Sequence, residues 1–361
     1  MTKLNRCIPI SSLITPATLN VETVLQTESS MFNVSTLDIS QAGPYFNYAF
    51  VVPGQNDTNH LKYLGSRTII TRLTVATAST GQILRLPVPF TNTTYEQTFF
   101  GPFVQSQDAN TTVASQIDAA AKRRTLAIVP SIQEVSNEYF AFVPALSDSN
   151  WNLSSSEVKI PNLTDANGAL NASNQLWFRF PRYQTDHNIT QLPDPHYLSC
   201  ELHNSSYRVR FSWVNGIQSL DILDMDVGDP IVYPTNAFST DLDEDNMAYS
   251  AVMEALSNRL TGAMGFYHNA NTTNDPSSAT TASRVYSQID SNIEQTSLLG
   301  SSDLNSYFIQ NHALSNVTDG SIFSKQRLRD MALARNRTLD VLIQEFSSNI
   351  TLSLISEPLL A

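Results

Sequence analysis

Cysteine is scarce in this chain of 361 residues, which has only Cys7 and Cys200. No Cys-x-x-Cys pair occurs, and neither cysteine has a nearby pair of histidines, so the ligand spacing of a zinc site is missing. The sequence therefore gives no support for cytosolic redox chemistry or for a structural zinc.

Charged residues are also few, at 15% of the chain. An average soluble protein has about 25%. Ser, Thr and Asn occupy positions where Lys and Glu are usual, which is typical of an extracellular glycoprotein. The formal net charge is −12. This excess of acid excludes a nucleic-acid partner, because binding to phosphates needs a basic face.

Long hydrophobic runs are missing as well. No segment reaches the ~18 apolar residues of a membrane span, and the basic start "MTKLNR" lacks the uninterrupted apolar run of a signal peptide. If the protein is translocated, its signal or its membrane spans lie outside this chain. We therefore expect a luminal or extracellular part of a longer protein.

Catalytic motifs are absent from the sequence too. It has no Gly-x-Ser-x-Gly elbow, phosphate loop or dinucleotide fingerprint. The acidic stretch 241–246 lacks the Gly and Glu of a calcium loop. Asp221, Asp224, Asp226 and Asp229 form another acidic stretch. Glycoside hydrolysis needs two facing carboxylates, but nothing selects a pair. We assign no catalytic, cofactor-binding or metal-ligating residue and expect no cofactor.

The strongest pattern present is the Asn-x-Ser/Thr triplet of N-glycosylation. Chance would give roughly six triplets in a chain this rich in Asn, Ser and Thr, and about twice as many occur, none with Pro in the middle. They begin at Asn33, Asn56, Asn92, Asn110, Asn152, Asn162, Asn171, Asn188, Asn204, Asn271, Asn316, Asn336 and Asn349. This spread predicts passage through a eukaryotic secretory pathway, with at least half of these asparagines exposed, since glycans must face solvent.

Secretion makes a lone thiol a liability. We therefore predict a disulfide between Cys7 and Cys200, with their Cα atoms within about 7 Å. Two separate thiols are the alternative.

The first two-thirds of the sequence predict mainly strands, at 68–75, 83–90, 138–143 and 175–180, with a helix over 111–123. Residues 197–223 predict a three-stranded meander. In it, Tyr207, Val209, Phe211 and Trp213 alternate with polar residues, "HNSS" at 203–206 forms the first turn and Asn215-Gly216 the second.

From about residue 245 the hydrophobic period becomes helical. Helices are predicted within 246–264, over 283–294 and over about 325–346, and "ITLSLIS" at 350–356 predicts a strand that returns to the sheet. The fold class is α+β, with a β-rich, sandwich-like region and helices mainly in the C-terminal third. We divide the chain into a β-rich region with glycosylated loops, 1–244, and a helical region, 245–361, packed together as one ectodomain.

Several segments resemble a group of uncharacterised fungal multi-pass membrane proteins. They are "SLITPATL", "LSCELHNSSYRVRFSWVNGIQ", "AYSAVMEALSNRLTGAM", "QTSLLGSSDL" and "SKQRLRDMALARNRTLDVLIQEFSSNITLSLIS". The resemblance implies a large glycosylated ectodomain between membrane helices, at the outer face of the plasma membrane. It departs in having only two cysteines, where many relatives have more. It implies no activity for any residue.

Three functions are consistent with this sequence. The first is a non-enzymatic surface module that binds or senses an extracellular ligand or a cell-wall component. The second is a secreted or wall-associated hydrolase of carbohydrate, which needs a cleft with two carboxylates. The third is a structural, capsid-like protein whose triplets are unused.

Overall fold

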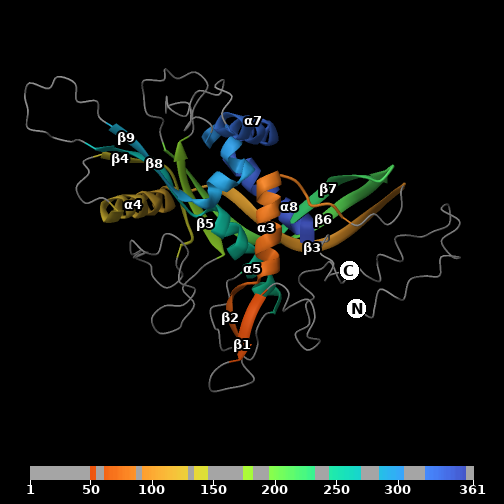
Figure 1. Cartoon of the computed structure of the whole chain (residues 1–361). Helices are drawn as coiled ribbons and strands as arrows, with labels where there is room; N and C mark the ends of the chain where they lie inside the picture. Colours follow the sequence, from red (N-terminus) through yellow and green to blue (C-terminus); the bar gives the residue numbers. More distant parts are fainter. Residues whose placement is uncertain are drawn as a thin grey trace, which may run out of the picture.

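The computed structural model describes residues 49–53, 61–86, 92–128, 134–144, 174–181, 195–231, 244–269, 284–304 and 322–354. These residues form an α+β fold, in which helices pack around one long antiparallel sheet (Figure 1). The α+β class expected from the sequence is confirmed.

Seven of the described strands form the main sheet, in the order β3-β6-β5-β4-β8-β9, and β7 also pairs with β6. Their bounds are β3 Thr93–Asp108, β4 Glu134–Phe142, β5 Gln175–Pro181, β6 Pro195–Val214, β7 Ile217–Pro230, β8 Gly262–Asn269 and β9 Arg284–Ser291. Strands β1, Ala49–Pro53, and β2, Leu61–Ser66, form a separate hairpin. In the described residues, helices cover the long sheet where the sandwich-like prediction placed a second packed sheet.

The helices lie on both faces and at one edge of this sheet. They are α3 Thr68–Thr80, α4 Thr111–Ile128, α5 Glu244–Leu260, α7 Ile322–Ala334 and α8 Leu339–Leu354, with 3₁₀ turns η4 Asn292–Gln295 and η5 Ser297–Gly300. Helices α3, α5 and α8 share one apolar cluster with the sheet, and α4 packs in a second cluster with Phe140, Phe142 and Trp177. Among the described helices, none is long and apolar enough to cross a membrane.

Strand β6 changes its buried face halfway along its 20 residues. In its first half Leu198, Cys200 and Leu202 point into the core made with α5 and α8. In its second half the odd-numbered residues from Tyr207 to Trp213 point into a separate aromatic core. The pairing with β3 stays in register throughout, so one regular strand supplies opposite faces to two cores. We call the part formed by β7, the second half of β6 and the first half of β3 the arm; it extends away from the helices in Figure 1.

Helix α8 covers the outer edge of β3, which has no strand partner among the described residues. The Ser347 hydroxyl accepts a hydrogen bond from the Val104 N–H at 2.8 Å, and the Thr351 hydroxyl donates to the Pro102 carbonyl at 2.5 Å. The Gln344 amide donates to Ser106 Oγ at 2.6 Å. Because these side chains bond edge backbone and side-chain groups, a helix closes an edge that would otherwise attract another strand.

The strand predicted at 350–356 is therefore wrong within the described residues, because Ile350–Leu354 belong to α8. All residues of α8 from Phe346 to Leu354 are buried. A helix buried on every side has no amphipathic period, and a short apolar segment of this kind cannot be told from a strand by periodicity. Thr351 bonds β3 and Ser353 accepts from the Leu84 N–H. The apolar residues pack on both sides, Ile350 and Leu354 in the main core and Leu352 in the aromatic core of the arm.

Two other elements differ in type from the predictions. Residues 68–75 form α3, where Ile70, Leu73 and Thr77 give a buried helical stripe that the β-branched composition concealed, and Gly81 ends the helix at φ 63°. Residues 284–291 form β9, which pairs with β8 over its full length and is not a helix. Pairing along an existing sheet overrides local propensity here.

The predicted strand 83–90 does not form in its described part, residues 83–86. The backbone of this segment bonds to side chains. The Leu84 N–H donates to Ser353 Oγ at 2.9 Å, and the Leu86 N–H donates to Gln218 Oε1 at 2.7 Å. The segment thereby covers the aromatic core of the arm, to which Leu86 belongs.

The other local predictions are confirmed with two exceptions. The first is the single helix predicted over about 325–346, which the turn at Arg335 and Asn336 divides into α7 and α8. Strands β4 and β5 and helix α4 form as expected. Asn215 and Gly216 turn the β6–β7 hairpin at φ 52° and 75°, the angles of a type I′ turn. The second is 203–206, which continues β6 where a turn was expected. The backbone there pairs with β3 on one side and, with a register irregularity, β7 on the other.

The proposed boundary near residue 244 does not separate strands from helices. Strand β8 comes after this boundary and pairs with β4, which comes before it, in the main sheet. Helix α8 likewise bonds to β3. The two regions therefore share one core.

Candidate functional site

Five of the thirteen predicted glycosylation asparagines lie in the described part of the chain: Asn92, Asn110, Asn204, Asn336 and Asn349. The other eight, Asn33, Asn56, Asn152, Asn162, Asn171, Asn188, Asn271 and Asn316, lie outside the described residues. A glycan is carried on Nδ2, so this atom has to reach solvent.

Asn92 and Asn110 are exposed and are held through Oδ1 alone. Asn92 Oδ1 accepts from the Asn215 N–H at 2.9 Å, which fixes it at the tip of the arm. Asn110 Oδ1 accepts from the Val113 N–H at 2.9 Å and so caps the first turn of α4. Among the described residues, neither Nδ2 donates a hydrogen bond. Both side chains therefore keep their orientation while leaving the glycan-bearing atom open.

Asn336 is exposed as well, in the turn between α7 and α8. It has φ 55°, and the preceding Arg335 has φ 52°. Asn tolerates this left-handed backbone better than most residues. Because the side chain is exposed, a glycan at Asn336 has access to solvent.

Asn204 and Asn349 are different. Asn204 is half-buried, and its Oδ1 accepts from the Tyr249 hydroxyl at 2.9 Å. Asn349 is only 9% exposed, and its Nδ2 itself donates to the Gly81 carbonyl at 3.5 Å. Thr351, the third residue of that triplet, bonds the edge of β3. In this fold no glycan fits at Asn349, and both polar residues of the triplet serve to pack α8.

Cys200 is fully buried in the main core and is a free cysteine within the described residues. Burial, with a smaller contribution from Asp340, raises the pKa of its thiol. A buried thiol of this kind is unreactive. Cys7 lies outside the described residues, so the Cys7–Cys200 disulfide stays a prediction.

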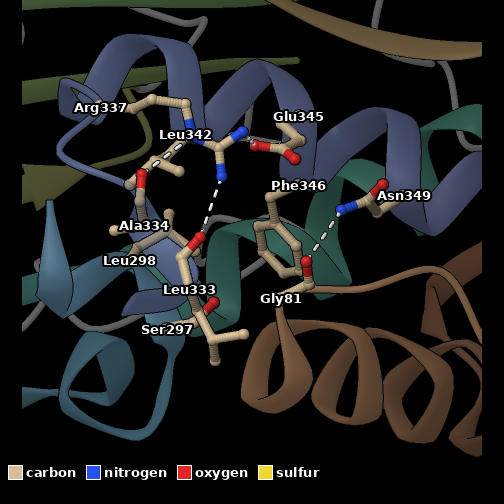
Figure 2. A pocket seen from close by; sticks show the side chains of 10 residues that line it. All are labelled: Gly81, Ser297, Leu298, Leu333, Ala334, Arg337, Leu342, Glu345, Phe346 and Asn349. Atoms are coloured by element: carbon tan, nitrogen blue, oxygen red, sulfur yellow. Dashed lines mark hydrogen bonds and ion pairs between the residues drawn. The ribbon is translucent and has the colours of Figure 1, made fainter. Parts of the chain in front are cut away.

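A pocket lies where the end of α3 meets η5, α7 and α8 (Figure 2). It is small and opens to solvent. Arg337 is the one cationic side chain among the residues that line this pocket. Its guanidinium donates to the Ala334 and Leu333 carbonyls at 2.9 and 3.1 Å and forms an ion pair with Glu345. Because these contacts engage Arg337, the pocket offers no open anion site.

Metal-binding groups are not found among the described residues. No group of three His, Cys, Asp or Glu side chains has the arrangement of a metal site there. His196 faces the Asp108 carboxylate at 3.0 Å, and His203 contacts the Gly228 carbonyl at 2.9 Å. Each has a local structural partner.

A partly buried network of polar side chains joins α4 to the sheet. Asp118 of α4 accepts from Arg179 Nε at 3.0 Å and from the Tyr197 hydroxyl at 2.7 Å. Burial, together with the hydrogen bond to Asp118, raises the pKa of Tyr197 to about 12. The phenol therefore remains a donor at neutral pH, and the network orients α4 on β5 and β6.

The outer face of the arm carries charges that the sequence did not bring together. Glu96 of β3 accepts from Arg208 at 2.8 Å and from Arg210 at 2.7 and 3.1 Å. Hydrogen bonds from Arg210 and Arg208 lower the pKa of Glu96. The acids of β7 lie on the other side of these arginines, since Asp221 is the cross-strand partner of Arg210 and Asp224 that of Arg208.

Comparisons of the chain with protein-family models, curated proteins and solved structures find no match.

Proposed function

We propose that this chain is the N-glycosylated extracellular domain of a fungal membrane protein, with a non-enzymatic role in binding, sensing or surface structure. The observation that carries the proposal is the exposure of three acceptor asparagines, Asn92, Asn110 and Asn336. Each heads an acceptor triplet, is exposed and leaves Nδ2 without a described hydrogen bond. The fungal origin and the flanking membrane spans rest on the resemblance of the sequence segments.

The physical character of the surface supports the same role. A chain with only 15% charged residues relies on neutral polar groups for solubility, and glycans add such groups. Glycans at the arm tip, at the start of α4 and at the α7–α8 turn would occupy three separate regions. The partner would then be an extracellular ligand or cell-wall component that docks between them.

The carbohydrate-hydrolase alternative finds less support. The described pocket is lined by one carboxylate, Glu345, which is paired with Arg337. A glycosidase site needs two carboxyl groups about 5–9 Å apart across the bond that is cleaved. No observation on this pocket favours that chemistry.

The test is secretion of the chain from a eukaryotic host behind a heterologous signal peptide. Enzymatic deglycosylation in heavy-oxygen water converts each occupied Asn to labelled Asp, which peptide mass spectrometry locates. We expect label at Asn92, Asn110 and Asn336 and none at Asn349. Replacing Thr94, Thr112 or Thr338 by alanine should remove one glycan each. A secreted, folded chain without label at any of the three exposed sites would refute the proposal.

A further inference from the structure

Strand β7 is an edge of the main sheet. It pairs with β6 on one side, and no described strand pairs with its other side. Its first six residues, Ile217–Ile222, pair with β6 without irregularity, and a bulge follows next to Leu223. A regular edge of this length presents a row of free N–H and C=O groups to which another strand can add.

Exposed apolar side chains gather on the same arm. Of the eight large hydrophobic residues that are exposed in the described structure, five lie on it: Phe100, Val214, Ile217, Ile222 and Leu223. Three of them belong to β7, where Ile217 is 74% exposed, Ile222 42% and Leu223 37%. Scattered exposed apolar residues are ordinary, but the three on β7 lie along an edge that lacks a described strand partner.

The outer face of the arm is net negative, because Arg208 and Arg210 are fewer than the acids Glu96, Asp221, Asp224 and Asp226 around them. Arg208 and Arg210 lie between two sets of acids, and both form their ion pairs with Glu96 on β3. The exposed Asp221 and Asp224 on β7 are left without a described cationic partner. The printed ion pairs of the arginines are thus made toward β3, and the excess acid lies on β7, beside the edge without a described strand partner.

From this combination we infer that the β7 edge binds an extended basic segment of another protein, which adds to the sheet as a further strand. Backbone hydrogen bonds would supply affinity, and Lys or Arg side chains of the partner would pair with Asp221 and Asp224. Ile222, whose cross-strand partner is Val209, lies on the opposite face from Asp221 and would contact the apolar residues that alternate with the basic ones in the incoming strand. The exposed Ile217 lies on the same face as Asp221. Charge complementarity selects the basic partner and sets the rate of encounter.

A second copy of this chain fits the edge less well. Pairing β7 with itself would bring the acids Asp221, Asp224, Asp226 and Asp229 close to their own copies. Like charges on adjacent strands are destabilising. The acids therefore act against self-association while leaving the edge open to a basic strand.

The inference deepens the binding role proposed above and is tested separately from glycosylation. The probe is a fluorescent ten-residue peptide that alternates lysine with valine or threonine, and its counterpart carries glutamate for lysine. Fluorescence anisotropy with the full chain should show binding of the lysine peptide at least about tenfold tighter than of the glutamate peptide. The difference should shrink in high salt, because the charges are exposed.

Two controls separate a β7 strand complex from general attraction to an acidic protein. The D221N/D224N variant should bind the lysine peptide about tenfold more weakly, whereas D108N/E294Q, with the same change in net charge, should bind within about twofold of the parent chain. A lysine peptide N-methylated at alternate residues loses the donors of one strand edge. One of the two N-methylation registers should abolish binding, because it removes the donors that face β7.

Each result is decisive. Equal binding or no binding of the two peptides overturns the inference, and so does an equal loss in D108N/E294Q. Unchanged binding of both N-methylated peptides would leave charge attraction without strand addition and overturns it too. Dimers of the parent chain in sedimentation at several concentrations, strengthened in D221N/D224N by the loss of like-charge repulsion, would favour self-pairing and contradict the inference. Secretion and glycosylation of the chain are unaffected by any of these outcomes.

Discussion

The two halves of β6 differ in what covers them. The first half lies within the body of the molecule, where α5 and α8 cover Leu198, Cys200 and Leu202. The second half lies in the arm. There Phe211 and Trp213 stack with Tyr95, at ring-centroid distances of 5.0 and 5.7 Å, under the segment 83–86. One strand can therefore belong to a core shared by many elements and to a core made of neighbouring strands, so stability need not be uniform along it.

The largest expected effect is on the body core. Phe178 is fully buried between β4 and β6, and Phe178→Ala is expected to lower the free energy of unfolding by about 3–5 kcal/mol. The loss should be global, because many elements share this core. Urea denaturation measures the energy, and hydrogen exchange should accelerate across the whole sheet.

Phe211→Ala is the matched change in the arm, where Phe211 is 1% exposed. Its faster hydrogen exchange should be confined to β7 and the paired parts of β3 and β6. Equally global exchange in both variants would contradict the separation of body and arm.

The junction of the two regions is the next test. A Cβ added at Gly101 would lie 2.5 Å from Thr351 Cγ2, while its other neighbours stay at ordinary contact distances. Gly101→Ala should therefore destabilise by up to about 3 kcal/mol through overpacking of α8 on β3. Thr351→Ser removes that methyl carbon and keeps the hydroxyl that bonds the Pro102 carbonyl.

The double variant G101A/T351S should therefore recover most of the stability lost in G101A. Thermal denaturation of the four proteins in this cycle measures the coupling. Additive losses in the double variant would mean that Gly101 is required for some other reason.

A pH effect in which stability falls as the pH rises is expected from the body, which buries a carboxyl group. Asp330 of α7 is 7% exposed, and burial raises its pKa from 3.8 to about 6, against the opposing charge of Arg329. The folded state therefore holds the proton more tightly than the unfolded state. The contribution of Asp330 to the free energy of unfolding is therefore fully present below pH ~4 and is lost as the pH rises through ~6.

Asp330→Asn should abolish this contribution. The difference in unfolding free energy between the parent and Asp330→Asn should change by on the order of 2 kcal/mol between pH 4 and pH 7. Denaturant titrations at several pH values measure it, since carboxyl groups common to both proteins cancel. A constant difference would show that the carboxyl is solvated.

Features of the fold that depend on neighbouring residues could be predicted from the sequence, whereas features that depend on contacts between distant residues could not. Local signals succeeded: Asn215-Gly216 fixed the hairpin, and alternation from Tyr207 to Trp213 identified the arm core. The change of buried face in β6 was missed, because period two marks one face without saying what covers it.

The candidate sites show the same limit. The acceptor triplets are local motifs and were found, but only packing distinguishes the open Asn110 from the buried Asn349. The pairing of Glu96 with Arg208 and Arg210 joins residues more than a hundred positions apart. No local pattern could place them together. Sheet register, which sets that contact, follows from the whole fold.

The smallest expected effect compares two exposed acceptors, one in each region, in unglycosylated protein from a bacterial host. Asn110 caps α4, a helix of 18 residues, whereas Asn92 bonds a single N–H in the arm turn. Asn110→Ala should cost about 1 kcal/mol of unfolding free energy because a helix cap is lost. Asn92→Ala should cost about 0.5 kcal/mol, because the N–H it leaves behind is exposed and finds water. Asn110→Asp is the control, since its carboxylate caps equally well while abolishing the acceptor triplet. If Asn110→Asp lost as much stability as Asn110→Ala in urea titrations, the cap would not be the reason for Asn at this position, and glycan attachment would be its remaining role.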